Sequence, residues 1–513
     1  GLGDVYKRQF LYRDERSLSL AINKKCVLFY TALAVFSIFL ACLSTNYDFD
    51  LFARLIVGER FIEQGILPFK DFLSYTPTHP WYDHEWGSGV VFYFLIKHLG
   101  PFGLVAFQAA VMFFTSVFVV KTQRLQKHAL PSSLIFMGIF LALFLKLNSS
   151  LVRCQLFSFL FFSIFLYILE STRRGKHKNL IWIFPPLVIL WNNVHGGVVS
   201  GLGLIAMYFA GAVIERKPWK KYLAVLITSG LALVINPYGP KYLNFLFSAA
   251  TKHRKYIVEW WPFFAYRHIL YYILPSLFGI FGFLSAIRTK KIDVTKIIVL
   301  AVTLYCGLAH VKLLSITVIA AAALCYNDMA VFFLRFKKGL KKFEKSLYPA
   351  IFVLALMIPL FSPTAARCDE EKFPLYEMEF LKINNIKGNL VTPFALGSYA
   401  TYKLYPDILI FMDGRYEEVY NDEEFKVLKQ YDLVDKNWKD IFTKYPTDIL
   451  MPYKESGTYT ILKQEPDWVH IFDGRICGIF VKKGKENFSY FEPEYDMNYY
   501  RKTMFKHGDF TND

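Results

Sequence analysis

The sequence predicts a polytopic α-helical membrane protein that carries a soluble α/β domain at its C-terminal end. Three observations lead to this fold class. The 513-residue chain is 54% hydrophobic and 18% aromatic. Its apolar residues gather in runs of about the 20 residues that cross a bilayer core. From about residue 366 the composition becomes polar, with short alternating segments. Such a composition argues against a disordered chain and against a simple soluble enzyme.

The apolar runs predict about eleven transmembrane helices in a domain that covers residues 26–362. The second run is too long for one straight helix. We expect it to break between Gly100 and Pro101, with its first part re-entrant or at the interface. The expected spans lie near residues 26–44, 90–120, 130–147, 153–171, 180–194, 196–215, 221–236, 268–287, 294–309, 312–334 and 346–362.

Positive charges set the expected orientation. Lys and Arg number 59 against 42 Asp and Glu, a formal net charge of +17, and they cluster in alternate connections between the apolar runs. Clusters of this kind mark cytoplasmic loops and do not indicate a nucleic-acid partner. We therefore expect a multi-pass membrane protein with a cytoplasmic N-terminal segment, residues 1–25, and an extracytoplasmic C-terminal domain. The first apolar run is long enough to span, so we expect a membrane helix there and not a cleaved signal peptide.

The C-terminal region, residues 366–486, is expected to form a small extracytoplasmic α/β domain, followed by a polar tail over 487–513. The seven cysteines include no CxxC motif, and only Cys368 and Cys477 are placed where they could meet in a soluble domain. Short apolar runs predict strands at 389–394, 408–414, 448–453 and 478–483, and helical patterns occupy 398–405, 422–431 and 437–445.

Polar residues at the outer ends of the helices are the candidates for function. A polar group in or near hydrocarbon is costly unless it has a partner or a task. On the expected topology the inner ends receive basic anchors and little else. The outer ends receive Asp48, Asp50, His84, Glu85, Arg153, Gln155, Asn192, Asn193, His195, Asn236, Glu259, His310 and Lys312.

The first outer loop, residues 45–89, carries the strongest signal. Asp48 and Asp50 follow the first span and precede an amphipathic run, which we expect to form a helix in the plane of the interface. Either carboxylate could cap that helix. The pair could instead supply a catalytic base or, together with His84 and Glu85, ligands for a divalent cation such as Mg²⁺ or Mn²⁺.

Two later segments offer contacts for an anion. Arg153, close to Gln155 at the outer end of a span, is either a snorkelling anchor or a planar clamp for a lipid-linked phosphate. Asn193 and His195 stand at a helix-to-helix turn before two glycines. That turn is either a tight polar hairpin or a helix start that presents free N–H groups to an anion.

A late outer turn and the long loop before it complete the candidates. His310 and Lys312 interrupt an otherwise apolar stretch, and Lys is an unusual residue for an outer turn. They form either a simple topological turn or part of a site. Glu259 lies in a tryptophan-rich segment and is a weaker candidate, whereas Asn236 starts an NPYG turn and is expected to be structural.

Several motifs carry a resemblance that covers nearly the whole chain. They are the acidic pair after the first span, DFLSYT, WxDHEW, RxQLF, LWNNVHGG, NPYG and, near the C-terminus, GSYATYKLYPxILIFMDGRYEEVY. Together they resemble a family of uncharacterised bacterial multi-pass proteins that is similar in architecture to the GT-C superfamily of polyprenyl-phosphate-sugar glycosyltransferases. That family usually has Arg in the late turn where this chain has His310 and Lys312. The sequence has no sugar-nucleotide Rossmann motif or P-loop, which agrees with a lipid-linked donor.

The resemblance implies a GT-C-like glycosyltransferase of the bacterial inner membrane. It would move a sugar, with inversion, from a polyprenyl phosphate to an extracytoplasmic glycan, lipid or protein acceptor. Asp50 would be the base or a metal ligand and Asp48 its partner. Two rival functions stay open at this point: a lipid or solute transporter or flippase, and a non-catalytic assembly protein of the envelope. The residues implied on the side of the donor phosphate are Arg153, Gln155, Asn193, His195, His310 and Lys312.

Overall fold

The computed structural model describes residues 24–43, 47–126, 133–147, 152–252, 254–265, 269–289, 292–333, 350, 353, 372–486, 489–494, 496, 499–500 and 503–505. Several predictions fall outside the described residues. They concern the N-terminal segment before residue 24, almost all of the expected span 346–362, Cys368, and much of the tail 487–513.

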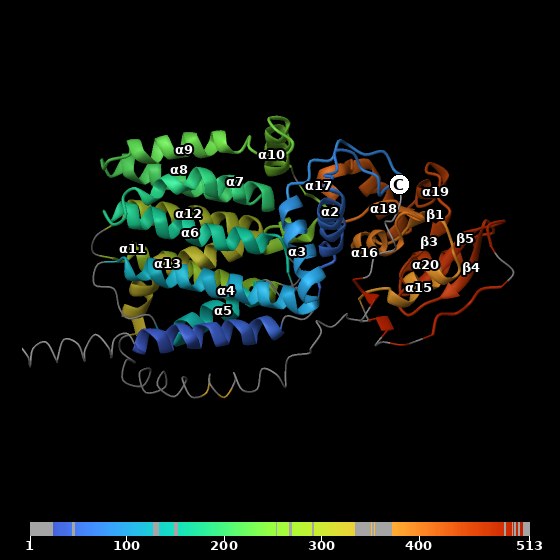
Figure 1. The fold of residues 1–513 in the computed structure, drawn as a ribbon, viewed down its shortest axis with the longest axis horizontal. Helices are drawn as coiled ribbons and strands as arrows, with labels where there is room; N and C mark the ends of the chain where they lie inside the picture. The colour runs from blue at the N-terminus through green and yellow to red at the C-terminus, as the bar shows by residue number, and fades with distance from the viewer. Residues whose placement is uncertain are drawn as a thin grey trace, which may run out of the picture.

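The described residues form a bundle of helices with a small sheet domain beyond one of its ends (Figure 1). Five helices are long and apolar enough to cross a membrane: Lys24–Leu43, α4, α6, α11 and Val311–Ala330, which includes most of α13. Four shorter apolar helices lie among them. A mostly helical fold with several candidate spans is therefore confirmed, whereas the number of about eleven spans stays a prediction. The helices are α3 (Trp86–Leu99), α4 (Pro101–Arg124), α5 (Leu134–Leu147), α6 (Gln155–Arg173), α7 (Phe184–Val194), α8 (Val198–Ile214), α9 (Lys220–Ala232), α10 (Lys241–Thr251), α11 (Ile269–Ile287), α12 (Val294–Ala309) and α13 (Leu314–Phe333).

The predicted break in the second apolar run is confirmed. Helix α3 ends at Leu99, Gly100 adopts a positive φ of 62°, and Pro101 is the first residue of α4. Proline is well placed there because its missing N–H has no partner in the first turn of a helix. Only glycine adopts this backbone conformation readily, so the pair explains why one long apolar run becomes two helices.

Connections between the long helices alternate between the two ends of the bundle, and the C-terminal domain lies at only one of them (Figure 1). The expectation that the opposite end holds little besides basic anchors is wrong. There the buried carboxylate of Glu170 accepts hydrogen bonds from Arg173, Arg174 and Tyr208, and Arg173 also forms an ion pair with Asp293. Basic residues at this end therefore neutralise a buried acid.

The C-terminal domain is the predicted α/β fold. Its five-stranded sheet has the order β2-β1-β3-β5-β4, in which β2, β1 and β3 are parallel and β5 and β4 are antiparallel additions. The predicted strands correspond to β1 (Gly388–Val391), β2 (Ile408–Ile410), β3 (Ile449–Leu450) and β5 (Gly478–Lys482). The helices are α15 (Leu375–Ile383), α16 (Phe394–Leu404), α17 (Tyr416–Val419), α18 (Asp422–Asp432), α19 (Asp440–Thr443) and α20 (Gly457–Leu462).

Strand β4 (Trp468–Asp473) was not predicted from the sequence. Its pairing with β5 has a register shift between His470 and Phe472. A bulge of this kind interrupts the alternation of buried and exposed side chains by which a strand is recognised.

Helix α2 (Leu51–Gln64) joins the bundle to the C-terminal domain, because it packs against α3 on one side and α16 on the other. All eight residues from Leu51 to Gly58 are buried. The apolar side chains expected to lie in a membrane interface therefore pack against protein over these two turns. The loop after α2 runs along the edge of the sheet, where Ser74 pairs with Ile410 of β2.

Candidate functional site

A small pocket that opens to solvent lies where α2, α3, α6 and the turns before α8 and α13 meet. The structure thus brings together residues that are far apart in the sequence. The expected convergence of Arg153, His195 and Lys312 on one cavity is confirmed. The lining residues are Asp48, Asp50, Leu51, Arg54, Glu85, Phe92, Val152, Arg153, Cys154, Gln155, His195 and Lys312.

Arg153 is surrounded by carboxylates. Its Nε lies 2.8 Å from Asp48 Oδ2, and one terminal nitrogen lies 2.7 Å from Glu259 Oε1. The other terminal nitrogen is 3.7 Å from Asp50 Oδ2. Arg153 is therefore not a snorkelling anchor that reaches for lipid headgroups, because its guanidinium is held by three acidic side chains at the pocket.

Asp50 does not cap α2, although it occupies the position before the helix. Its side chain accepts no capping hydrogen bond. Asp48 instead accepts the backbone N–H of Asp50 at 3.0 Å. The carboxylate of Asp50, half exposed within the pocket, is therefore available for chemistry. The low polarity of the surrounding protein disfavours the charged carboxylate, and the negative charge of Asp48 is the second cause. Together they raise the pKa of Asp50 to about 7. This value is close to the one that suits a general base at neutral pH.

Gly414, in the loop between β2 and α17 of the C-terminal domain, lies directly against Asp50. A Cβ at this position would collide with Asp50 Oδ1. The absence of a side chain therefore lets the C-terminal domain approach the candidate base closely.

Lys312 and His310 differ in their placement. Lys312 lines the pocket, and its Nζ lies 3.6 Å from Glu259 Oε2. His310 is absent from the lining of this pocket, and its Nδ1 is 2.7 Å from the backbone carbonyl of Trp260. The prediction that His310 contacts a donor phosphate therefore has no support in the geometry, since its ring ties the turn before α13 to the loop before α11.

His195 is a neutral hydrogen-bond donor. Its Nδ1 accepts the backbone N–H of Gly197 and lies 2.6 Å from Ser158 Oγ, whose oxygen accepts the indole N–H of Trp191. Since Nδ1 accepts, the proton belongs on Nε2, which lies 3.4 Å from Glu85 Oε1. Burial lowers the pKa of His195 to about 3. His195 can therefore donate to a ligand but adds no positive charge.

Asn193 belongs to the polar hairpin and not to the pocket. Its amide group donates to the carbonyls of Ile189 and Ile235, and its oxygen accepts the indole N–H of Trp86 at 2.9 Å. The structural interpretation of this turn is correct for Asn193, because both ends of its side chain are used to hold α7 against its neighbours. Gln155 does line the pocket, at the start of α6.

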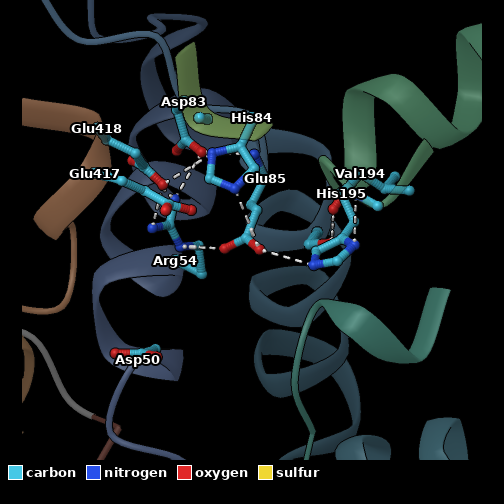
Figure 2. A network of polar contacts seen from close by, with 12 residues as sticks. Asp50, Arg54, Asp83, His84, Glu85, Val194, His195, Glu417 and Glu418 are labelled. Carbon is cyan, nitrogen blue, oxygen red and sulfur yellow. Dashed lines mark hydrogen bonds and ion pairs between the residues drawn. The ribbon is translucent and has the colours of Figure 1, made fainter. Parts of the chain in front are cut away.

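A second cluster, centred on Arg54 of α2, connects the pocket wall to the C-terminal domain (Figure 2). The guanidinium of Arg54 is 2.7 Å from Asp83, 3.1 Å from Glu85 and 2.7 Å from Glu418 of α17. Arg54 is only 3% exposed and Glu418 only 4%, so these are buried ion pairs across the domain junction. The same Glu418 accepts the indole N–H of Trp81 at 2.8 Å.

His84 completes the Arg54 cluster. Its Nδ1 is 3.2 Å from Glu418 and its Nε2 is 3.7 Å from Glu85. Burial opposes the charged form, but these two carboxylates outweigh it and raise the pKa of His84 to about 9. Both carboxylates are themselves ionised. Burial raises the pKa of Glu418, but the positive charge of Arg54 outweighs burial and brings this pKa below its usual range. The pKa of Glu85 is lowered in the same way.

The four predicted metal ligands do not come close enough together to form one ligand set among the described residues. His84 and Glu85 come within 4.8 Å of Glu418, which is the one group of metal-type ligands found among the described residues, and Asp48 and Asp50 are not part of it. Figure 2 shows Asp50 apart from this cluster, near the start of α2. The carboxylates of the group already bind Arg54, and His84 carries a proton on the nitrogen that a metal would need. The residues present therefore fit a divalent cation poorly.

Two central residues were missed by the sequence analysis. Arg54 stands four residues after Asp50, a spacing that places both on one face of a helix. A charged residue on the otherwise apolar side of that run was a usable signal. Glu418 lies in the DGRYEEVY motif, but nothing in that motif indicates which residues of the first outer loop it meets.

No family model matches the chain, and no match was found among the curated proteins.

Proposed function

We propose that this protein is a membrane glycosyltransferase of the GT-C type, which transfers a sugar from a polyprenyl phosphate to an acceptor at the extracytoplasmic face. The observation that carries the proposal is the pocket itself, where the carboxylate of Asp50 lies beside Arg153 and which Lys312 also lines. A base for an acceptor hydroxyl and cations for a leaving phosphate are the two components that this reaction requires.

In the proposed reaction, Asp50 takes the proton of the acceptor hydroxyl. The acceptor oxygen forms a bond to the anomeric carbon, while the bond from that carbon to the phosphate oxygen breaks. The electron pair of the broken bond leaves with the polyprenyl phosphate, whose added charge is stabilised by Arg153 and Lys312. Attack from the side opposite the phosphate inverts the anomeric carbon.

The position of the pocket favours this function over a lipid or solute transporter or flippase. Asp50 precedes α2, Arg153 precedes α6 and Lys312 precedes α13, so the polar groups gather at one end of the bundle. A translocation path is instead expected to have binding groups near mid-depth. A non-catalytic envelope assembly protein would have no need of a half-exposed carboxylate whose pKa is shifted toward neutrality.

Turnover of radiolabelled polyprenyl-phosphate sugars by the purified protein tests the proposal, with a crude envelope extract as the source of acceptor. We expect the label to move from the polyprenyl-phosphate sugar to another molecule of the extract, and unlabelled polyprenyl phosphate to appear in equal amount. Parallel reactions with and without a chelator separate a metal-dependent from a metal-independent reaction. A label that stays on the lipid but moves between the leaflets of a vesicle would favour the flippase, and a label that does neither would favour the assembly protein.

A further inference from the structure

Each pair of nitrogens through which Arg153 could bind a phosphate already includes one nitrogen that is paired with a carboxylate. A guanidinium holds a phosphate most strongly through two neighbouring nitrogens at once. A guanidinium offers two such pairs: Nε with one terminal nitrogen, and the two terminal nitrogens together. In this structure Asp48 binds Nε and Glu259 binds one terminal nitrogen. The other terminal nitrogen, which belongs to both pairs, faces Asp50. A ligand phosphate can therefore take a two-point hold only if one carboxylate leaves.

Glu259 bridges the two cations in the way that a phosphate would. One of its oxygens lies 2.7 Å from Arg153 and the other 3.6 Å from Lys312. Two oxygens of one phosphate group could make the same pair of contacts. We propose that Glu259 is an internal counter-anion that keeps Arg153 and Lys312 paired until the phosphate of the donor displaces it. This inference rests on the proposed function, because it assigns the ligand of these cations to a lipid-linked phosphate.

Asp48 is poorly placed to leave instead of Glu259. Asp48 is only 8% exposed, and its second oxygen accepts the backbone N–H of Asp50, so its departure would leave two partly buried donors, Arg153 Nε and this N–H, without that partner. The Glu259 side chain is 35% exposed and stands on a short 3₁₀ turn, Val258–Trp260, outside the lining of the pocket. It can swing toward solvent at a lower cost.

The charges of this cluster also favour exchange over simple addition. Asp48, Asp50 and Glu259 bring three carboxylates to two cations, Arg153 and Lys312. The net charge of this set is therefore already neutral or negative before a phosphate binds. An added phosphate would be repelled, because like charges at such distances repel strongly when solvent is limited. Release of Glu259 makes this set one charge more positive, and the negative charge of the phosphate replaces the charge that has left.

Binding of farnesyl phosphate and of inorganic phosphate to the purified full-length protein tests this inference. We expect Glu259→Gln to bind farnesyl phosphate about tenfold more tightly than the wild type. Glu63→Gln is the matched control, because Glu63 is also paired with a lysine and is similarly exposed, at 41%, but lies near the far end of α2. Its affinity should equal that of the wild type. In an Arg153→Gln or a Lys312→Gln background most of the gain should vanish, since the released cation pair is incomplete.

The outcomes are separable. Equal or weaker binding by Glu259→Gln would overturn the inference and leave Glu259 as a residue that positions the cations, with the proposed function intact. A gain of the same size in the Arg153→Gln and Lys312→Gln backgrounds would also overturn it, because it would show only a long-range charge effect. A failure of every variant to bind either probe would remove both the inference and the donor chemistry of the proposed function. A gain for both probes supports displacement, and preference for farnesyl phosphate assigns the phosphate to a lipid.

Discussion

Asp50→Asn is expected to lower turnover by about 100-fold or more. The amide can neither take the proton from the hydroxyl group of the sugar acceptor nor carry the charge that orders Arg153. The fold should survive, since the Asp50 side chain caps no helix and is half exposed in the pocket. Steady-state transfer rates and thermal unfolding in detergent, measured side by side, check both parts. An Asp50→Asn variant with full activity would leave the catalytic role without support.

Asp48→Asn is the control for that experiment, and its damage should be of a different kind. Asp48 is buried and holds both Arg153 and the backbone of Asp50. Loss of its charge is expected to cost about 1–3 kcal/mol of stability.

The pH profile of the wild type adds a second test of Asp50. Because the pKa of Asp50 is raised to about 7, wild-type turnover should rise as the pH increases through that value. A profile that falls over this range would contradict the assignment.

Arg54→Met is expected to have the largest effect on stability, about 3–5 kcal/mol, because it leaves buried carboxylates without their cation. Asp83, Glu85 and Glu418 all lie within 3.1 Å of this guanidinium. The loss should appear as a lower midpoint of thermal unfolding and as protease cleavage between the bundle and the C-terminal domain. A double-mutant cycle tests the coupling: Arg54→Met combined with Glu418→Met should be much less damaging than the sum of the two single changes. Additive effects would mean that the pair does not hold the junction.

Much of the fold could be predicted because it depends on local chemistry. The break at Gly100 follows from backbone conformation, and the apolar runs follow from the thickness of a bilayer. The convergence of Arg153 and Lys312 could also be predicted, since helices that cross the same layer bring alternate turns to the same end. Strand β4 could not, because its bulge disrupts the pattern that marks a strand.

The candidate site was predictable only where its residues belong to the helix ends. Glu418 meets Arg54 through the docking of a separate domain, and no local pattern encodes that contact. Asn193 was misassigned because its partners, Trp86 and the carbonyl of Ile235, come from distant segments. The role of Glu259 was underestimated for the same reason: its significance lies in the two cations that it bridges.

A structure of the protein in lipid nanodiscs with a bound polyprenyl phosphate tests the central claim most directly. The account predicts that the phosphate lies in the pocket, about 3 Å from nitrogens of Arg153 and Lys312, with Asp50 open to the side from which an acceptor enters. A phosphate bound outside this pocket, or at mid-depth between the helices and away from Asp50, would contradict the account.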